Sequence, residues 1–424
     1  MTSGTTVVLL AAGKGTRMKS ERPKVLHELC GRSMLGWVIE ATLGLEPDRI
    51  IVVIGHGAAE VEAAARAEVS GVDVEFVVQE PQLGTGHALK VAAPAIGDAE
   101  RVVVTYGDMP LLSAESLASL VEAQKNGAGG AVSILTAVVD QPFGYGRIVR
   151  GEDQTFERIV EQKDAAPHER LIDEINLGVY CFARETLDDD LARLRDDNAQ
   201  GEFYITDLAG IAAGDGRRVT PVVLDDASEA QGVNDLAQLA DVRWQVQMRI
   251  LEQHMANGVR IVDPATTFVD HGVEIGGDTE ILPCTVLRGG VRIGSGCEVG
   301  PFTHLRTGAV LEDGAQVGNF TEMKNSRLGA GSKAKHLSYL GDTVVGARAN
   351  IGAGTIFANY DGKAKHPSVV GDRAFIGSGT IIVAPNEIPA EATTGAGAVL
   401  TRSAKMGEGE TWVGLPARRL DPPR

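Results

Sequence analysis

The sequence contains few cysteines and no long hydrophobic run, and each shortage excludes a class of protein. The four cysteines among 424 residues show no CxxC pair and no spacing typical of metal ligands. We therefore expect reduced, buried thiols in a cytoplasmic protein rather than a disulfide framework. No hydrophobic stretch is long enough to span a membrane, and the short apolar run at residues 7–12 lacks the basic segment of a signal peptide.

Positive charge is also in short supply. The chain has 40 Lys and Arg against 57 Asp and Glu, a formal net charge of −17. This balance disfavours nucleic acid and anionic membranes as partners. Anionic small substrates stay possible where basic side chains cluster locally, and two such clusters occur. A chain of this length is too long for one core and predicts two or three domains.

Between residues 275 and 323 an aliphatic residue or Met recurs at every sixth position. The series is Ile275, Ile281, Leu287, Ile293, Val299, Leu305, Leu311, Val317 and Met323. A period of six fits neither an α-helix nor a flat strand. It is typical of a left-handed parallel β-helix, in which three short strands form one triangular coil. Aliphatic side chains would fill its core, in agreement with an aromatic content of 4%. We expect this β-helix over residues 259–400, followed by an irregular tail.

The six-residue period slips near Arg327 and Leu340 and is interrupted again before Val370. One basic cluster lies in these irregular stretches: Arg306, Lys324, Arg327, Lys333, Lys335, His336, Lys363 and Lys365. Exposed Lys and Arg often only solvate the faces of a solenoid, and a lone His is more often structural than catalytic. The residues alone therefore leave both a structural and a chemical role open.

Residues 1–225 alternate strand-like and helical patterns. We predict strands at 6–10, 49–54, 74–78, 101–106 and 132–139, and helices at 34–43, 58–67, 88–95 and 114–124. This alternation predicts a doubly wound, mostly parallel sheet with ligand sites at the carboxyl ends of its strands. A long pattern without Gly or Pro at 235–256 predicts a linker helix, ended by Asn257-Gly258. We expect three parts: an α/β domain at 1–234, the linker helix at 235–258 and a β-helix domain with its tail at 259–424.

The first predicted strand ends in a glycine-rich segment, LAAGKGTRM at residues 10–18. Gly13 and Gly15 lack side chains, so backbone N–H groups there can approach a phosphate or a base edge. The second basic cluster follows, with Lys14, Arg17, Lys19, Arg22 and Lys24 against the single Glu21. This local reversal of charge indicates a polyphosphate site, although neither a Walker A loop nor a GxGxxG fingerprint is present.

Asp108 comes directly after the predicted strand at 101–106. A carboxylate at the end of a parallel strand is well placed to hold a metal ion. A turn or capping role would explain the same residue, so Asp108 alone leaves both interpretations open.

A series of motifs follows in order along the chain. After LAAGKGTRM come Pro23-Lys24, QLGTGH at 82–87, YGD at 106–108, YGR at 145–147, IVEQK at 159–163, EIN at 174–176 and GVN at 232–234. KHLSYLGD at 335–342 and NIGAGTIFANYDG at 350–362 lie in the irregular stretch of the β-helix. Over nearly the whole chain this set resembles the bacterial bifunctional enzymes that join an N-acetylglucosamine-1-phosphate uridylyltransferase to a glucosamine-1-phosphate N-acetyltransferase. The resemblance implies synthesis of UDP-N-acetylglucosamine, a peptidoglycan precursor, from UTP, acetyl-CoA and an amino-sugar phosphate.

For uridylyl transfer, the resemblance implies a role for each matching residue. Arg17 and Lys24 would be catalytic and would neutralise the triphosphate, and Asp108 and Asn234 would bind Mg²⁺. The nucleotide and the sugar would be held by Leu10, Ala11, Ala12, Gly13, Gln79, Gly84, Thr85, Tyr106, Gly107, Gly146, Glu161 and Asn176. Positioning and charge neutralisation suffice for such a transfer, which needs no protein nucleophile.

For acetyl transfer, the resemblance implies that His336 is the general base, a task that suits a His pKa near neutrality. Glucosamine-1-phosphate would be held by Arg306, Lys324, Tyr339, Asn350 and Lys365. Acetyl-CoA would lie along Ala353, Asn359, Tyr360, Ser378 and Ala396. Related β-helices are trimeric acyltransferases with sites between subunits, so we expect a homotrimer.

The chain departs from the family pattern at several places. Leu177 stands where the family has Thr, and Gln231 where it has Glu. The β-helix before Gly300 is shorter by about one or two coils, and the tail at 410–419 lacks the family's Arg that contacts CoA. We therefore expect weak binding of acetyl-CoA.

Two alternatives stay open at this stage. One is a monofunctional sugar-1-phosphate nucleotidyltransferase whose β-helix serves assembly or regulation, and the set of residues around His336 argues against it. The other is a non-catalytic scaffold with the same two-part architecture. The presence of Arg17, Lys24, Asp108 and Asn234 argues against a scaffold.

Overall fold

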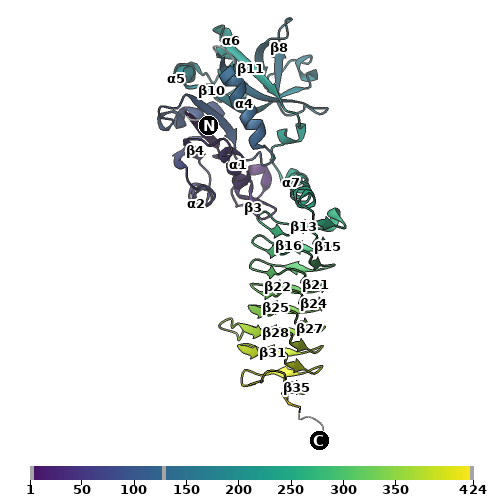
Figure 1. Cartoon of the computed structure of the whole chain (residues 1–424). Helices are drawn as coiled ribbons and strands as arrows, with labels where there is room; N and C mark the ends of the chain where they lie inside the picture. Colours follow the sequence, from purple (N-terminus) through teal and green to yellow (C-terminus); the bar gives the residue numbers. More distant parts are fainter. Residues whose placement is uncertain (1–3, 127–129, 421–424) are drawn as a thin grey trace. The chain divides into compact units, whose positions relative to one another are not determined.

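A computed structural model describes residues 4–126 and 130–420 of the chain (Figure 1). The chain divides into two compact units, Met1–Arg243 and Trp244–Arg424, and the division falls within the long helix α7 (Leu236–Ala256). This helix is the one predicted at 235–256. The predicted domain limits at 234 and 258 remain predictions. In the described ranges, no helix is long and apolar enough to cross a membrane.

The first unit is built around one sheet, to which the described residues contribute nine strands. Seven of them follow one another in the order β11-β7-β10-β6-β1-β4-β5, and β8 and β9 form a hairpin beside β10. Their bounds are β1 (Thr5–Leu10), β4 (Arg49–Ile54), β5 (Asp73–Val78), β6 (Arg101–Tyr106), β7 (Gly130–Val138), β8 (Gly146–Arg150), β9 (Phe156–Val160), β10 (Glu174–Ala183) and β11 (Arg218–Val223). Along the seven-strand path most neighbours are parallel, but β10 is antiparallel to both β6 and β7. The small strands β2 (Glu28–Leu29) and β3 (Arg32–Ser33) pair separately.

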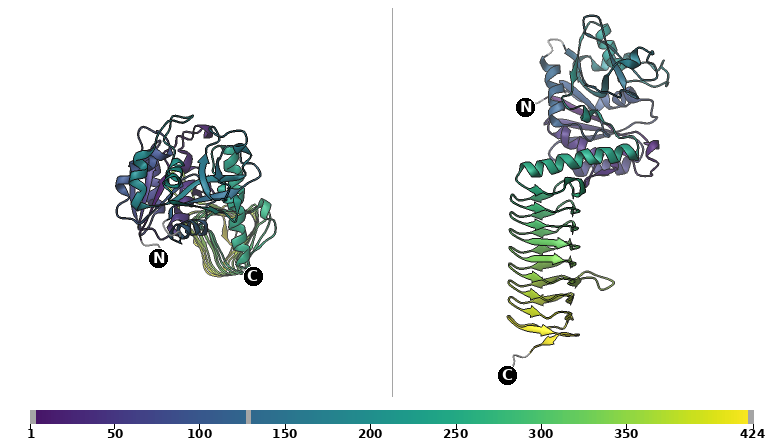
Figure 2. Two further views of the ribbon diagram at one scale, coloured as in Figure 1. Left: turned by 90° about the horizontal axis from the view of Figure 1, so that it is seen from above. Right: turned by 90° about the vertical axis from the view of Figure 1, so that its right-hand side faces the viewer.

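Helices cover both faces of this sheet (Figures 1 and 2). They are α1 (Met34–Leu43), α2 (Ala58–Glu68), α3 (Thr85–Ala92), α4 (Ala114–Asn126), α5 (Arg184–Arg193) and α6 (Asp207–Gly214). Alternate residues of β1 enter two separate cores, because successive side chains of a strand point to opposite faces. Val7 and Leu9 pack with α1, α2 and α4, whereas Val8 and Leu10 pack with α3, α5 and α6. The predicted doubly wound, mostly parallel sheet is confirmed.

The central strand β10 was not predicted from the sequence. The prediction rests on a regular β–α alternation, and an antiparallel strand in the middle of the sheet interrupts that order. For the same reason α5 and α6, which follow β10 in the chain, were not predicted.

The second unit is a left-handed parallel β-helix with three faces, which confirms the prediction (Figure 1). The first face holds β12 (Arg260–Ile261), β15 (Glu280–Ile281), β18 (Glu298–Val299), β21 (Gln316–Asn319), β24 (Lys333–His336), β27 (Asn350–Ile351), β30 (Phe375–Ile376), β33 (Thr393–Thr394), β35 (Thr411–Val413) and β36 (Arg418–Arg419). The second face holds β13 (Phe268–Val269), β16 (Val286–Leu287), β19 (His304–Leu305), β22 (Glu322–Lys324), β25 (Tyr339–Gly341), β28 (Ile356–Ala358), β31 (Ile381–Val383) and β34 (Val399–Leu400). The third face holds β14 (Glu274–Ile275), β17 (Arg292–Ile293), β20 (Val310–Leu311), β23 (Arg327–Leu328), β26 (Thr343–Val345), β29 (Ser368–Val370) and β32 (Asn386–Ile388).

The core of the β-helix follows from the repeat. The aliphatic residues and Met of the six-residue series from Ile281 to Met323 are buried in one continuous cluster, and Ile275 is partly buried against it. The small residues two positions earlier are also buried, and their hydroxyl groups are satisfied by backbone carbonyls. Thr279 donates to Gly294 O at 2.8 Å, and Thr303 to Gly318 O at 2.8 Å. Such internal hydrogen bonds remove the cost of burying a hydroxyl.

The interruptions of the repeat share one corner of the coil, between the second and third faces. Asn325 and Asp342 occupy this corner in successive coils, both with positive φ, and the longer segment after Ala358 leaves the coil at the same place. The carboxylate of Asp342 joins the three levels: it accepts from Asn325 Nδ2 at 2.7 Å and from Asn359 Nδ2 at 2.5 Å. The phase slips noted in the sequence therefore belong to one structural feature.

The tail is not irregular, in contrast to the prediction. β35 continues the first face by pairing with β33, and β36 folds back antiparallel to β35. Trp412 lies beside Thr394 and packs against the core, at a position that holds Ile351 and Ile376 in the coils before Thr394. The aromatic residue at this position hid the last coil from a search for aliphatic periodicity.

Candidate functional site

The first candidate site is a cavity of about 360 Å³ at the carboxyl ends of β1, β5 and β6. Most residues predicted to hold the nucleotide line it: Leu10, Ala11, Ala12, Gly13, Lys24, Gln79, Gly84, Thr85, Tyr106 and Asp108. Val25, Gln82, Ala88 and Glu202 complete the lining and were not predicted. Gly107 is buried beneath the cavity, where its amide donates to Leu10 O at 3.0 Å.

One end of this site brings together four predicted residues from distant parts of the chain. The ammonium of Lys24 forms a salt bridge with Asp108 Oδ2 and lies 3.3 Å from Asn234 Oδ1. Arg17 Nη2 donates to the same Asn234 oxygen at 2.8 Å. The side chains of Lys24 and Asp108 are only 13% and 19% exposed, so their charges interact with little screening. Two cationic side chains and two side-chain oxygen atoms that accept hydrogen bonds therefore meet at one point.

The approach of Lys24 to the glycine-rich segment depends on Gly15. This residue has φ +59°, and a Cβ placed on it would lie 2.5 Å from Lys24 Cβ. Only glycine satisfies both conditions without a shift of the backbone. The second glycine of the segment therefore positions the lysine.

The opposite wall of the cavity holds a set of amide groups. Gln79 is buried and donates from Nε2 to Gly84 O at 2.9 Å. Gln82 Nε2 donates to Ala12 O at 2.5 Å and so fixes the end of β1. Thr85 Oγ1 accepts from the amide of Ile205 at 3.2 Å, which ties the start of α3 to the segment before α6. Such oriented amide and backbone groups can distinguish the edge of a pyrimidine base.

The three residues predicted for the sugar converge beside β8 and β10. Gly146 pairs with Asn176 in the sheet, and a Cβ on Gly146 would lie 3.4 Å from Glu161 Oε1 and 3.6 Å from Asn176 Cβ. Asn176 is held by the Tyr180 hydroxyl, 2.9 Å from its Nδ2, and by the Gly178 amide, 3.1 Å from its Oδ1. The absence of a side chain at Gly146 leaves space in front of the carboxylate and the amide.

At the sugar end, formed by Gly146, Glu161 and Asn176, a carboxyl group is buried close to other acidic side chains. Burial, followed by the charges of Asp164 and Asp207, raises the pKa of Glu161, whereas a hydrogen bond from Thr206 lowers it. Burial also raises the pKa of Tyr106, and the negative charge of Glu161 adds to the shift. The effect of Glu161 on Tyr106 links the sugar end to the nucleotide cavity. Perturbed groups of this kind gather at functional sites.

Sequence reasoning missed Thr206, Asp207 and Tyr180, which surround Glu161 and Asn176. Thr206 and Asp207 lie at the start of α6, and Tyr180 lies on β10, both elements that were not predicted. The sequence ITD at 205–207 does not by itself indicate a binding or catalytic role. Of the two family departures, Leu177 is buried in the core next to Asn176 in the chain, and Gln231 ends a short 3₁₀ helix at 227–230, shortly before Val233, whose amide donates to Asp108 O.

The second candidate site lies on the β-helix, where its cations differ in their partners. Arg327 and Lys335 form salt bridges with Glu312 and Glu298, as expected of a solvated face. Arg306 is paired with Glu322 at 2.8 Å. Three of the predicted phosphate ligands nevertheless interact: side-chain contact with Lys365, then the charges of Lys365 and Arg306, lower the pKa of Lys324. Crowded cations of this kind favour an anionic ligand.

His336 ends β24 on the first face, at the corner between the first and second faces. Its carbonyl accepts from the Ser338 hydroxyl at 2.8 Å and from the Gly354 amide at 3.4 Å, which fixes the backbone of an exposed imidazole. Its Cα pairs with Asn319 of the coil before, and the Asn319 Oδ1 atom is buried without a hydrogen-bond partner. Sequence reasoning did not single out Asn319.

Tyr339 and Asn359 meet over Gly341 on the second face. A Cβ on Gly341 would lie 2.6 Å from the Tyr339 hydroxyl and 2.6 Å from Asn359 Nδ2. Asn350 lies on the neighbouring first face, between Lys333 and Phe375. The predicted ligands thus lie on two sides of the second face. Arg306, Lys324 and Lys365 lie at its corner with the third face, whereas Tyr339 starts the second face and Asn350 lies on the first.

Three of the residues predicted for acetyl-CoA form a column along the corner between the first and second faces, whereas Asn359 and Tyr360 follow β28 at the corner between the second and third faces. Ala353, Ser378 and Ala396 occupy the same position in successive coils, and the carbonyls of Ala353 and Ser378 accept from the next coil at 2.7 and 2.8 Å. The column begins one coil after His336, since the carbonyl of His336 accepts from the amide of Gly354, the residue after Ala353. Tyr360 is 60% exposed on the segment that leaves the coil.

Comparisons with known proteins cover both units. The sequence model of the MobA-like NTP transferase domain matches residues 7–204. The bifunctional protein GlmU of Trichlorobacter lovleyi is 43% identical over 93% of this chain and 93% of its own length. GlmU of Thermobifida fusca is 43% identical over 95% and 90% of the two chains, and GlmU of Mycobacterium tuberculosis 42% over 95% and 89%. These matches extend over the β-helix, so a monofunctional nucleotidyltransferase is not supported. The chain belongs to the GlmU family of bifunctional enzymes, which acetylate glucosamine-1-phosphate and transfer a uridylyl group to the product to form UDP-N-acetylglucosamine.

Proposed function

We propose that uridylyl transfer takes place in the cavity of the first unit, with Arg17 and Lys24 on the triphosphate and Mg²⁺ between Asp108 and Asn234. The observation that supports this most directly is the convergence of the Lys24 ammonium on both Asp108 and Asn234. Two oxygen atoms within reach of one cation can also share a metal ion. The amide wall formed by Gln79, Gly84 and Thr85 then suits uracil, and Glu161 with Asn176 suits the sugar.

The residues present fit Mg²⁺. Carboxylate and amide oxygens are the hard ligands that it prefers, and it is commonly held by one or two protein ligands together with substrate phosphates. The described ranges contain no group of three or more His, Cys, Asp and Glu that could hold a metal by themselves. When bound, Mg²⁺ would stabilise the negative charge that develops on the phosphates.

The side chains of this chain then perform positioning and charge neutralisation. The phosphate oxygen of N-acetylglucosamine-1-phosphate attacks the α-phosphorus of UTP, and the bond to pyrophosphate breaks. Arg17 and Lys24 stabilise the charge on the leaving pyrophosphate. Gly146 leaves space for the sugar, which Glu161 and Asn176 orient for in-line attack.

For acetyl transfer we propose that His336 is the general base. The sugar nitrogen attacks the carbonyl carbon of the thioester, the carbon–sulfur bond breaks, and His336 takes the proton that the nitrogen loses. Arg306, Lys324 and Lys365 hold the sugar phosphate, and Tyr339 and Asn350 orient the sugar. The column of Ala353, Ser378 and Ala396 presents small side chains along which acetyl-CoA can lie, and Asn359 and Tyr360 would contribute from the next corner of the coil.

We further propose a cytoplasmic homotrimer that acts on small molecules and binds no nucleic acid. The β-helix exposes large apolar side chains in successive coils, and Phe302 and Phe320 stack with 5.3 Å between ring centroids. Exposed apolar strips of this kind mark interfaces. The four cysteines form no disulfide, which suits a reducing compartment. Light scattering should give about three times the mass of one chain, and the mass of a single chain would contradict the assembly.

A pair of variants tests both assignments. Asp108→Ala should abolish most uridylyl transfer at any Mg²⁺ concentration and leave acetyl transfer intact, because the two sites lie in different units. His336→Ala should lower acetyl transfer by about two to four orders of magnitude, the usual range for a general base, and leave uridylyl transfer from N-acetylglucosamine-1-phosphate intact. Both rates are measured separately on each variant. Near-normal pyrophosphate release by Asp108→Ala, or near-normal acetylation by His336→Ala at saturating acetyl-CoA, would refute the corresponding role.

A further inference from the structure

The segment between β28 and β29 leaves the β-helix as a projecting loop, which Figure 2 shows on the lower half of the coil. We define it as the 359–366 loop, from Asn359 to His366. Its two strands meet at a single β-bridge between Tyr360 and Lys365. Lys365 is therefore the one proposed phosphate ligand that no coil of the β-helix holds directly.

Asp361 organises this loop. Its carboxylate accepts from the amides of Lys363 and Ala364 at 2.9 and 2.8 Å, and His366 Nε2 lies 2.7 Å from its Oδ2. Arg402 of a later coil lies 3.4 Å from the same oxygen. Hydrogen bonds from Ala364, His366 and Lys363 hold the pKa of Asp361 well below its usual range. The carboxylate stays ionised and accepts these donors at any pH at which the enzyme works.

The ends of the loop are fixed to the β-helix. The amide of His366 donates to Asn359 O at 2.8 Å, which closes the loop, and Asn359 Nδ2 donates to Asp342 Oδ2 at 2.5 Å. The guanidinium of Arg402 is itself held, since its Nε donates to Ala384 O at 2.7 Å. The pair formed by Asp361 and His366 thus connects an exposed loop to rigid coils on both sides.

This connection can offset the repulsion between two lysine side chains at the phosphate site. The loop starts at the corner that holds Lys324, because the amide of Asp342 donates to Lys324 O at 3.1 Å and the carboxylate of Asp342 accepts from Asn359 at 2.5 Å. Lys365 is also the first cause of the lowered pKa of Lys324. Two like charges at short distance repel each other, and an exposed loop that contains Gly362 loses conformational entropy when it is fixed. Without an anchor, Lys365 would move away from Lys324 into solvent.

We propose that Asp361 and His366 form a positioning pair that holds Lys365 beside Lys324, so that the cations of the phosphate site are assembled before the sugar phosphate binds. This inference rests on the proposed role of Lys365. His366 donates from Nε2 to Asp361 and does not touch the substrate. Its loss should weaken binding of glucosamine-1-phosphate and leave the chemical step intact, because His336 lies on a different element.

The test compares His366→Ala with His366→Gln, whose side-chain amide can still donate to Asp361. His366→Ala should raise the KM for glucosamine-1-phosphate by about tenfold, the expected loss for one hydrogen bond to a charged group. Its kcat at saturating substrates and its uridylyl transfer should stay within about twofold of the wild type. His366→Gln should restore most of the KM. An unchanged KM in His366→Ala, an equal fall in kcat, or no rescue by His366→Gln would each overturn the positioning role.

Lys365→Ala separates this inference from the function on which it rests. If Lys365→Ala leaves the KM for glucosamine-1-phosphate unchanged, the proposed phosphate ligand itself is wrong. If Lys365→Ala raises the KM and His366→Ala does not, the phosphate ligand holds and the positioning pair is refuted. If both raise the KM, the double variant should be no worse than Lys365→Ala alone, since His366 acts through Lys365. An additive loss in the double variant would contradict the positioning role.

Discussion

Two carboxyl groups at the sugar end of the first unit, Glu161 and Asp207, are unfavourably placed for a stable fold. Burial, together with the charges of Asp197 and Asp164, raises the pKa of Asp207 to about 6, from an ordinary value of 3.8. Burial raises the pKa of Glu161 as well. Functional sites often keep charged groups that destabilise the folded state. The hydroxyl groups of a sugar can donate hydrogen bonds to Glu161 that the protein does not supply.

The raised pKa of Asp207 predicts how stability depends on pH. Between pH 3.8 and about 6 the folded state holds more protons than the unfolded state, so the free energy of unfolding falls as pH rises through this range and stays lower above it. Asp207→Asn removes the charge and should raise Tm at pH 7.5 by about 2–4 °C, after solvent screening is allowed for. The gain should disappear near pH 4. Thermal melts at both pH values check this, and equal Tm values at pH 7.5 would count against it.

Individual residues of the cavity could be predicted where a local motif carries the chemistry. Gly13, Lys24 and Asp108 lie in or next to short motifs at strand ends, and the structure brings Lys24 and Asp108 together. Thr206 and Asp207 could not be predicted, because they reach Glu161 only through the start of α6. The position of Asn319 beside His336 could not be predicted either, because it depends on how successive coils pair.

At the scale of elements, the repeat predicts the three faces but not what happens at their corners. A single missing residue shifts the phase, and the pattern alone does not say on which corner the shift falls. In the structure Asn325, Asp342 and the 359–366 loop stack on one corner and are joined by hydrogen bonds to Asp342. The last coil was missed because Trp412 replaces an aliphatic residue.

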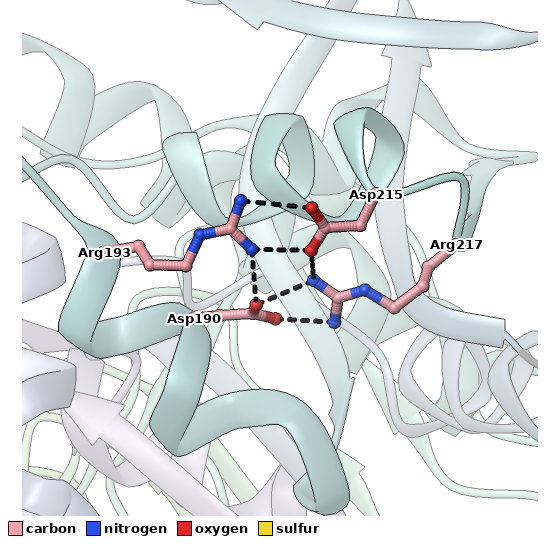
Figure 3. A network of polar contacts seen from close by, with 4 residues as sticks. All are labelled: Asp190, Arg193, Asp215 and Arg217. Atoms are coloured by element: carbon pink, nitrogen blue, oxygen red, sulfur yellow. Dashed lines mark hydrogen bonds and ion pairs between the residues drawn. The ribbon is translucent and has the colours of Figure 1, made fainter.

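The ends of α5 and α6 are joined by a network of two carboxylates and two guanidinium groups, shown in Figure 3. Arg217 makes two hydrogen bonds to Asp190, at 2.7 and 2.8 Å, and a third to Asp215 at 2.8 Å. Arg193 makes two hydrogen bonds to Asp215, at 2.5 and 3.1 Å. The side chain of Asp190 is 7% exposed, whereas that of Asp215 is 36% exposed.

This difference in burial predicts unequal losses of stability. Asp190→Ala leaves Arg217 without its buried partner and should lower the free energy of unfolding by about 3 kcal/mol. Asp215→Ala removes a more exposed partner and should cost less than about 1 kcal/mol. Urea unfolding of the two variants gives both values. Equal losses would show that the network acts as a surface feature.

At the scale of the whole molecule, each unit has its own core and its own site. The β-helix core and the two cores of the α/β unit are separate clusters of buried residues. The product of acetyl transfer is the substrate of uridylyl transfer, so the two sites are linked by a diffusible sugar phosphate. Despite a net charge of −17 the chain concentrates cations at both candidate sites, as suits the anionic substrates of the family.

The most direct measurement supplies glucosamine-1-phosphate, acetyl-CoA, UTP and Mg²⁺ and resolves the products by mass. The wild-type chain should form UDP-N-acetylglucosamine. Asp108→Ala alone should accumulate N-acetylglucosamine-1-phosphate, His336→Ala alone should leave the amino sugar unacetylated, and a mixture of the two variants should restore the nucleotide sugar. Failure of the mixture to restore it, or acetylated product from His336→Ala at the wild-type rate, would contradict two independent sites on one chain.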